Sequence, residues 1–218
     1  PTFKVQRPVL AYGRVRHVGE CLACVVAESA QIAMDALELI EIEYDDLPVL
    51  ADPVAALAPD APLIHPEIPG NLFLDWEAGD AAKTEEAFRK AAHRVSLRVY
   101  NNRVVAQPLE PRACLAVHDQ AADVTTLHCP SQGVSQQVNM LAAATGLPAS
   151  KVNVVARDVG GGFGSRAFVY CEDVAVVLAA RLLKRPVKWT GTRNEVFLND
   201  THGRDCVQHG ELALDAGG

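Results

Sequence analysis

The stretch that decides the fold covers residues 151–184 and reads KVNVVARDVGGGFGSRAFVYCEDVAVVLAARLLK. Its first part, 151–157, is rich in β-branched residues and predicts a strand. Its last part, near 168–184, predicts a helix that stops before Pro186. Between them, four glycines occupy five positions, 160–164. Because glycine loses the most backbone entropy on folding, such a run indicates positive φ angles or a close approach to a ligand.

A glycine loop of this kind suits an anion, because consecutive backbone N–H groups can bind it and a following helix adds its positive end. Gly162, Gly164 and Ala167 satisfy the spacing of the dinucleotide-binding fingerprint. That fingerprint also needs an acidic residue about 20 positions further on, and residues 182–192 contain none. No Gly-Lys-Ser/Thr follows, which excludes a P-loop. A tight turn without any ligand is the simpler interpretation.

Upstream of the loop, residues 112–118 and 123–129 predict two strands, and residues 131–145 predict a helix stopped by Gly146. Gln132 follows the second strand directly, at the sheet edge where ligands bind in parallel and mixed sheets. A glutamine amide both donates and accepts, which suits an amide-rich heterocycle. As a lone residue, Gln132 is also typical of a helix start.

The N-terminal part predicts a β-α-β unit followed by a connector. Residues 21–27 are a continuous apolar run of strand length, Ser29 is a candidate N-cap, and 39–44 alternate strictly. In that second strand the acids Glu41 and Glu43 form its solvated face. The proline-rich residues 45–79 predict a connector, which precedes a helix near 82–92 and strands over 94–100 and 210–214.

Composition excludes several classes of protein. The 218 residues suffice for a core that buries about 70% of the unfolded surface. Twenty basic and 27 acidic residues give a formal charge of −7, with no basic stripe, which argues against nucleic-acid binding. The longest apolar runs are far shorter than the roughly 20 residues that cross a bilayer.

Six cysteines lie in apolar contexts, too few for a disulfide scaffold, which favours a reducing compartment and a cytoplasmic location. Cys21 and Cys24 form a CxxC, but no second CxxC or histidine pair completes a zinc site. We therefore interpret the pair as structural. Cys171, like most free cysteines, is expected to pack in an apolar environment.

Five separated motifs, considered together, resemble the molybdopterin-binding large subunit of the xanthine dehydrogenase, aldehyde oxidase and carbon monoxide dehydrogenase family. Residues 8–50 also resemble the end of that family's α/β hammerhead domain. The motifs, in chain order, are Gln107-Pro108-Leu109-Glu110-Pro111-Arg112, Pro130-Ser131-Gln132, Asp158-Val159-Gly160-Gly161-Gly162-Phe163-Gly164, Arg185-Pro186-Val187-Lys188-Trp189, and Arg193 with His202-Gly203-Arg204.

The resemblance implies an α+β (mixed α/β) fold: part of a hammerhead-like domain at 1–52, a connector at 53–79, and the N-terminal portion of a molybdopterin-binding domain at 80–218. It implies a molybdenum-pterin cofactor, as molybdopterin or its cytosine dinucleotide form, with the metal held by the pterin rather than by side chains. The implied cofactor-binding residues are Gln132, Gly160, Gly161, Gly162, Phe163 and Gly164.

The resemblance also implies a molybdenum hydroxylase that oxidises an aldehyde, heterocycle or similar small substrate with water as oxygen source. The catalytic glutamate is expected beyond Gly218, so this chain alone is expected to be inactive. Iron–sulfur clusters and FAD are expected on other chains, which makes those subunits and the remaining large subunit partners. Self-association is a further expectation, because apolar surface is left for missing chain.

Two departures and one alternative accompany this hypothesis. Purine-oxidising members commonly have glutamate where this chain has Ala167, which puts a purine substrate in doubt; Arg166 stands where lysine is frequent. Glu172 and Asp173 are acids near the loop, but their place in a first helical turn is equally consistent with solvated residues favoured by the macrodipole. The alternative function is a non-catalytic nucleotide-binding or scaffold module that uses the glycine loop.

Overall fold

The computed structural model describes residues 3, 5 and 7–218; residues 1, 2, 4 and 6, at the start of the predicted first domain, lie outside them. The chain divides into two compact units, each built from discontinuous segments. The first unit comprises 1–6, 46–104 and 203–218, and the second comprises 7–45 and 105–202. The glycine loop and Gln132 both belong to the second unit.

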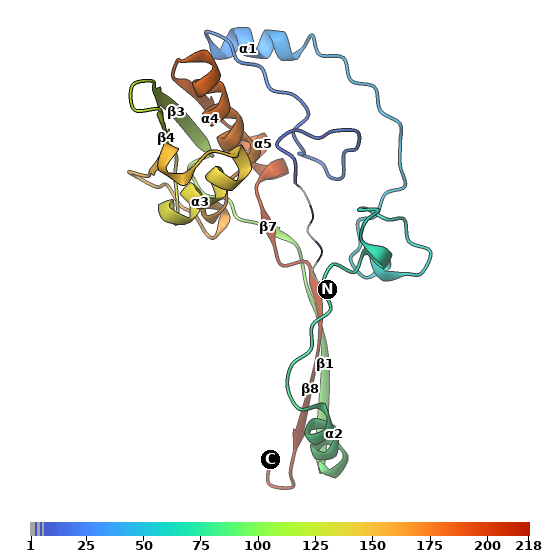
Figure 1. The fold of residues 1–218 in the computed structure, drawn as a ribbon. Helices are drawn as coiled ribbons and strands as arrows, with labels where there is room; N and C mark the ends of the chain where they lie inside the picture. The colour runs from blue at the N-terminus through green and yellow to red at the C-terminus, as the bar shows by residue number, and fades with distance from the viewer. Residues whose placement is uncertain (1–2, 4, 6) are drawn as a thin grey trace. The chain divides into compact units, whose positions relative to one another are not determined.

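A mixed four-stranded sheet forms the centre of the second unit (Figure 1). Its strands run in the order β5-β4-β3-β6; β3 is antiparallel to both neighbours, and β4 is parallel to β5. The predicted mixed α/β character is confirmed. The strands are β3 (Ala113–Asp119), β4 (Val124–His128), β5 (Val152–Val155) and β6 (Val187–Thr190).

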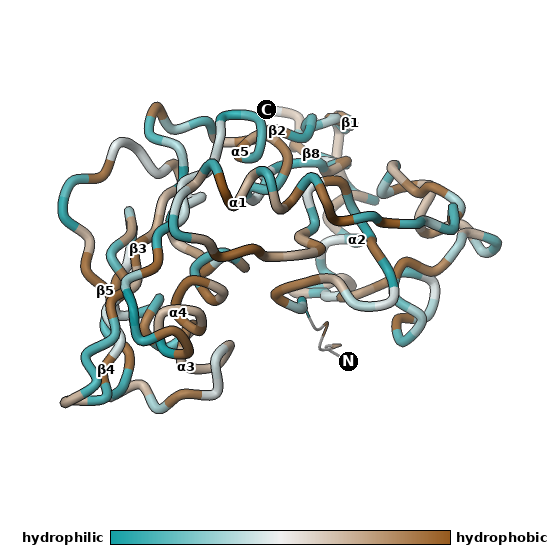
Figure 2. Tube along the Cα trace, turned by 90° about the horizontal axis from the view of Figure 1, so that it is seen from above, coloured by the Kyte–Doolittle hydropathy of each residue, from teal (hydrophilic) through white to brown (hydrophobic). Residues whose placement is uncertain are grey.

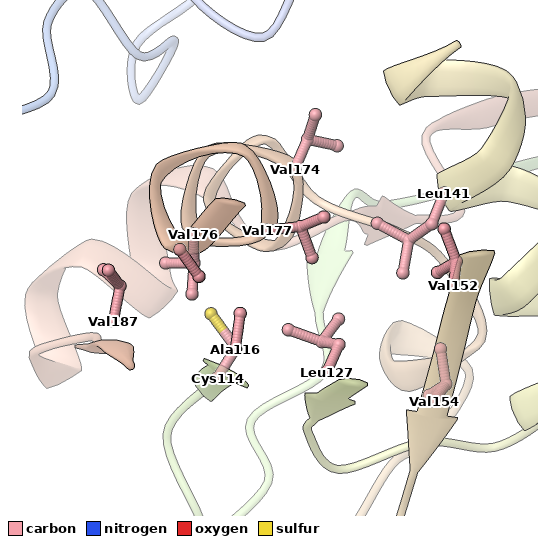
Figure 3. Close-up of a cluster of buried hydrophobic side chains, with 11 residues drawn as sticks. Cys114, Ala116, Leu127, Leu141, Val152, Val154, Val174, Val176, Val177 and Val187 are labelled. Atoms are coloured by element: carbon pink, nitrogen blue, oxygen red, sulfur yellow. The ribbon is translucent and has the colours of Figure 1, made fainter. Parts of the chain in front are cut away.

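The strand register places one apolar row across this sheet. Val187 pairs with Ala116, Ala116 with Leu127, and Leu127 with Val154. All four are buried, and the helices α3 (Val134–Thr145) and α4 (Cys171–Leu183) cover them with Leu141 and Val177. Figure 3 shows Val176 and Val177 of α4 directed toward this row. The tube of α4 is accordingly mostly brown in Figure 2. The two helices therefore share one face of the sheet.

Local signals correctly predict where the helices of this unit end. α3 ends at Gly146, whose φ of 72° is the left-handed conformation that glycine adopts without strain. α4 ends at Leu183 with Lys184 as its C-cap, ahead of Pro186. It begins at Cys171 rather than near 168, because a 3-10 turn, η4 (Ser165–Ala167), precedes it.

Two elements beyond α4 are absent from the sequence prediction. The strand β6 follows Pro186 directly, and a short helix, α5 (Arg193–Asn199), follows β6. α5 begins with a capping box in which Thr192 Oγ1 accepts from the Glu195 N–H at 3.2 Å, and the Glu195 carboxylate accepts from the Thr192 N–H at 2.6 Å. The T-x-x-E signal was present in the sequence.

Residues 7–45 of the second unit differ from the prediction. The helix α1 (Ala30–Leu37) forms and is capped by Ser29, whose Oγ accepts from the Ile32 N–H at 3.3 Å. The predicted strands 21–27 and 39–44 are wrong, because these residues are extended but belong to no sheet. A strand needs a neighbour for its backbone N–H and C=O groups. The described chain offers these two segments no ladder partner.

The first unit is an antiparallel ribbon with a helix and an irregular connector. β1 (His93–Asn101) pairs with β8 (Cys206–Leu214), and α2 (Ala81–Lys90) precedes β1. Both strands extend beyond the predicted 94–100 and 210–214. The connector holds two 3-10 turns, η1 (Ala55–Leu57) and η2 (Pro69–Asn71).

A further 3-10 turn of the chain is η3 (Ala149–Lys151), and a pair of two-residue strands is formed by β2 (Val104–Val105) with β7 (His202–Gly203).

Within the described residues, no helix is both long and apolar enough to span a bilayer.

Candidate cofactor site

The glycine loop leaves β5 and bends through three left-handed residues before η4. Their φ angles are 107° at Gly161, 50° at Phe163 and 92° at Gly164. The predicted need for positive φ is thus confirmed at two of the glycines. Phe163 adopts the same region despite its Cβ, and its side chain is 78% exposed. A strained, exposed aromatic residue is a feature of functional loops.

The other two glycines are needed because polar side chains approach them closely. A Cβ on Gly162 would lie 2.4 Å from Gln132 Cδ, and one on Gly160 would lie 2.5 Å from Glu110 Cβ. Both distances are too short for carbon atoms, so any side chain at these positions would displace the neighbour. The run of glycines therefore lets Gln132 and Glu110 reach the loop.

Gln132 fixes the far end of the loop through one oxygen atom. Its Oε1 accepts from the backbone N–H groups of Gly164 at 2.9 Å and Arg166 at 3.1 Å. Its own backbone N–H donates to the Arg166 carbonyl at 3.0 Å. With the oxygen used in this way, the amide Nε2 is the part of the side chain left for a ligand, and no described residue accepts from it. The sequence placed Gln132 near the loop but did not reveal this contact.

Glu110 fixes the near end of the loop in the same manner. Its Oε2 accepts from the Gly160 N–H at 2.7 Å, and its backbone N–H donates to the Gly160 carbonyl at 3.2 Å. The sequence contained Glu110 only as part of a motif and assigned it no role. No local pattern could have revealed it, because the partners are 50 positions apart in sequence.

Three successive N–H groups remain between these two anchors. Among the described residues, none accepts a hydrogen bond from the backbone nitrogen of Gly161, Gly162 or Phe163. Gly161 and Gly162 are half-buried and Phe163 is exposed, so an acceptor from a ligand can approach this stretch of backbone. The loop therefore presents a row of donors beside the amide nitrogen of Gln132, which suits a ligand rich in acceptor oxygens and nitrogens.

A buried ion network, formed by Arg166, Asp200, Arg112 and Glu172, underlies the loop. Arg166 is 2% exposed; it donates to the Glu110 carbonyl at 2.8 Å and pairs with Asp200 at 3.2 Å. Asp200 also pairs with Arg112. Arg112 in turn holds Glu172 through two nitrogens, at 2.8 and 3.0 Å. The charges alternate along the network, so each buried ion has an opposite partner.

Glu172 and Asp173 are buried rather than solvated, which corrects the interpretation of them as solvated residues. Burial opposes ionisation of Glu172, but hydrogen bonds and charge from Arg112 outweigh it and hold the pKa below its usual range. Asp173 accepts from the Tyr170 N–H at 3.0 Å, and burial raises its pKa. The helical position alone suggested exposure, since Arg112 lies 60 positions away in sequence.

Arg112 is held by more than its acidic partners. Its guanidinium carbon lies 3.9 Å from the centre of the Tyr170 ring and 5.1 Å from that of Trp189. Burial lowers the pKa of Arg112, but Glu172 and Asp200 more than compensate and raise it. Arg112 and Trp189 come from two motifs that are far apart in sequence, and the two motifs thus meet around the Arg112 guanidinium.

The dinucleotide interpretation loses its geometric basis. In that fold the glycines open a helix whose N-terminus faces the phosphates. Here η4 and residues 168–170 separate Gly164 from α4. The first turn of α4 also carries the buried acids Glu172 and Asp173, and Asp173 already accepts from the N–H of the N-cap residue Tyr170.

The family model for the molybdopterin cofactor-binding domain matches residues 64–218, and that for the a/b hammerhead domain of aldehyde oxidase and xanthine dehydrogenase matches residues 2–48. The chain belongs to this molybdopterin-binding family. The resemblance inferred from the motifs is therefore confirmed, as is the hammerhead end followed by a cofactor-binding domain.

Relatives of the family's molybdopterin-binding domain include the carbon monoxide dehydrogenase large chain of Hydrogenophaga pseudoflava, 36% identical over 96% of this chain and 28% of its own length. The nicotine 6-hydroxylase large subunit of Paenarthrobacter nicotinovorans is 36% identical over 97% of this chain and 26% of its own. The chain thus spans little more than a quarter of either relative.

Solved structures of the family are similar to this chain along almost its whole length. A Cu,Mo-CO dehydrogenase matches with a TM-score of 0.89 and 35% identity, over 95% of this chain and 28% of that one. Quinoline 2-oxidoreductase from Pseudomonas putida 86 matches with a TM-score of 0.87 and 34% identity, over 98% of this chain and 27% of that one.

The donor set of the loop fits the family's molybdenum-pterin cofactor. That group carries many acceptor atoms, and the loop offers three unpaired N–H groups beside the Gln132 amide. No side chain near the loop needs to ligate the metal, since the pterin supplies the sulfur ligands in this family.

Proposed function

We propose that this chain is the part of a molybdenum hydroxylase large subunit that cradles the molybdenum-pterin cofactor. When bound, that group supplies the two-electron oxidation of a small substrate, with water as the source of oxygen. The observation that carries the proposal is the anchoring of the glycine loop at both ends, by Gln132 and Glu110, which leaves three N–H donors between them.

The proposed division of labour follows from these contacts. Gly161, Gly162 and Phe163 donate backbone hydrogen bonds to the cofactor. Gln132 holds the loop with its oxygen and donates to the cofactor from Nε2. Glu110 and the buried ion network hold the loop in place but are not proposed to touch the cofactor. Backbone donors fixed in this way bind without further loss of loop entropy.

The substrate, partners and location remain part of the proposal. The relatives named above act, by their names, on carbon monoxide and nicotine, so we propose an aldehyde, heterocycle or similar small substrate. Ala167, in η4, replaces the acid that the resemblance leads us to expect in purine-oxidising members, which disfavours purines. We propose that the catalytic carboxylate lies elsewhere in the large subunit, and that iron–sulfur and flavin subunits receive the electrons. Six free cysteines favour the cytoplasm.

Gln132→Glu in the intact enzyme separates the two proposed tasks of Gln132. Glutamate keeps an oxygen that can accept from Gly164 and Arg166, but it replaces the amide donor with a second acceptor. We expect turnover to fall at least about 10-fold, as when a hydrogen bond to a charged or polar group is lost. The thermal unfolding midpoint should stay near that of the wild type. Turnover and molybdenum content per subunit are the measurements.

Two further variants complete this test. Gln132→Ala removes both tasks and should lower turnover and cofactor content together. Gln136→Ala, on the exposed face of α3, is the matched control and should leave both unchanged. Unchanged turnover in Gln132→Glu would remove the amide nitrogen from the site. Tight NAD binding to the cofactor-free enzyme, abolished by Gly162→Val, would instead support the nucleotide-binding alternative.

A further inference from the structure

Two cysteines that are 150 positions apart in sequence meet in the second unit. Cys21 lies in the extended apolar run 21–27, and Cys171 is the first residue of α4. Their Sγ atoms are 3.0 Å apart, and both thiols are free and half-buried. This contact is not explained by the CxxC motif, because Cys24 is exposed and has no thiol partner among the described residues. It also falls outside the glycine loop and its anchors.

The surroundings of the pair admit a small reactant. Both thiols line a cavity of about 590 Å³ between residues 9–37 and the segments of α4 and β6. Two other cysteines of the second unit differ. Cys114 is buried in the core, and burial raises the pKa of Cys129 to about 12, so neither supplies a thiolate at neutral pH.

The hydrogen bonding makes the two thiols unequal. The hydrogen bond with Cys171 lowers the pKa of Cys21; burial and the charge of Glu172 oppose this shift, and Arg112 supports it. The contact with Cys21, burial and the negative charge of Glu172 all raise the pKa of Cys171, whose Sγ donates to Glu172 Oε2 at 3.2 Å. A thiol whose pKa is lowered, in contact with a second thiol whose pKa is raised, is an arrangement that favours thiol–disulfide exchange.

We propose that Cys21 and Cys171 form a reversible disulfide when the protein meets a small-molecule disulfide such as oxidised glutathione. The Cys21 thiolate attacks one sulfur of the oxidant, which forms a mixed disulfide and releases one glutathione thiolate. Cys171 then loses its proton to solvent and attacks the Cys21 sulfur, which releases the second glutathione thiolate. Two protein thiols are oxidised and one glutathione disulfide is reduced to two thiols. The disulfide is a site of oxidative modification separate from the proposed cofactor site.

The cross-link would tie together two parts of the unit that no sheet joins. Residues 21–27 have no strand partner, so the run is held by side-chain packing and scattered hydrogen bonds. Near it, the exposed pair Glu28–Arg185 at 3.4 Å adds little. Local opening is what makes unpaired segments sensitive to proteases. A covalent bond from Cys21 to α4 would restrict such opening of residues 21–27.

A metal ion is the competing occupant of this place. The ligand atoms of Cys21, Cys171 and Glu172 lie within 4.8 Å of one another, which could suit zinc. However, both carboxylate oxygens of Glu172 already bind Arg112. A zinc ion would have to compete with that buried ion pair, so we favour the disulfide.

Peptide mapping of the intact protein tests the proposal. After treatment with oxidised glutathione and blocking of free thiols, trypsin should release a cross-link between residues 17–83 and 167–181, which carry Cys21 and Cys171. Dithiothreitol should abolish it. Cys21→Ser and Cys171→Ser should each lower its yield at least about 10-fold, as expected when the attacking or resolving thiol is removed.

Cys24→Ser is the matched control, because the same tryptic peptide carries both Cys21 and Cys24. It should leave the cross-link at the wild-type yield. The proposal is overturned if the link survives Cys21→Ser, if no link forms in the wild type, or if stoichiometric zinc co-purifies and protects both thiols from the oxidant. Slower limited proteolysis of residues 21–27 in the oxidised protein would support the proposed restraint.

Discussion

Similar apolar sequences form different structures in the two segments of the second unit. Residues 105–202 build a sheet in which each apolar strand finds a neighbour, and α3 and α4 seal its face. Residues 7–45 contain the apolar run 21–27 and the alternating run 39–44, but neither belongs to a sheet. The difference teaches that apolar patterning determines which face of a strand is buried, whereas a hydrogen-bonding neighbour determines whether the strand forms at all.

The contrast extends to charge. In residues 105–202, the buried ion network joins η4, α4, the residue before β3 and the C-cap of α5 beneath the glycine loop. The ion pair that links residues 7–45 to the end of α4, between Glu28 and Arg185, is exposed on both sides. Buried partners depend on each other strongly, while exposed partners are screened by water.

Arg112→Ala gives the largest effect expected from this comparison. The change leaves the buried Glu172 without its cationic partner and leaves Asp200 with Arg166 alone. Removing one partner of a buried ion pair costs about 3–5 kcal/mol of unfolding free energy. Arg185→Ala, the matched control at the exposed pair, should cost at most about 1 kcal/mol. Urea denaturation of both variants checks the difference. Similar losses would mean that the buried ion network does not stabilise this region.

Leu127→Ala gives the next largest effect. Leu127 is 1% exposed at the centre of the apolar row, so its truncation leaves a cavity and costs about 3 kcal/mol. Leu39→Ala changes the same residue type where the side chain is 82% exposed, and should cost less than about 0.5 kcal/mol. A large loss at Leu39 would show that residues 39–44 are packed after all. The midpoint of urea unfolding is the measurement.

The pH dependence of Glu172→Gln gives the smallest and most specific expected effect on the free energy of unfolding. The folded pKa of Glu172 lies below its ordinary value of 4.5, so its charge stabilises the fold above that pH and the contribution is lost as pH falls through the folded pKa. The wild type should therefore exceed Glu172→Gln in stability at neutral pH. The gap should narrow only in acid, below 4.5.

Unfolding of both proteins across a pH series measures this gap, with Glu41→Gln as the exposed control. A gap that does not change with pH would assign the effect to packing rather than to the charge of Glu172.

Much of residues 105–202 was predictable because its signals are local. The helices α3 and α4 followed from apolar spacing and from stop signals at Gly146 and Pro186, and β3, β4 and β5 followed from short apolar or β-branched runs between turns. The short elements β6 and α5 were missed, although Thr192 and Glu195 carried a capping signal. The place of Gln132 at a ligand-binding sheet edge followed from its position after a strand, and its grouping with the glycine loop followed from the family resemblance.

The anchoring contacts of the site were not predictable in the same way. Glu110 meets Gly160 over 50 positions, and Arg112 meets Glu172 over 60. Sequence reasoning did not distinguish a buried Glu172 from a solvated one, because its own helix gave no sign of a buried partner. It also treated Cys171 as packing, whereas its thiol faces Cys21. Long-range contacts of this kind depend on how the strands are ordered, which no local pattern states.

By itself, the sequence determined the family, the mixed α/β character, and the glycine loop with Gln132 as the place to look for a cofactor. Those features depend on residue type and spacing along the chain. Only the tertiary structure decided that 21–27 is no strand, that the glycines admit Gln132 and Glu110, and that two distant cysteines touch. The physical reason is that hydrogen-bond neighbours, close approaches and burial belong to pairs of segments, and the chain must fold before those pairs exist.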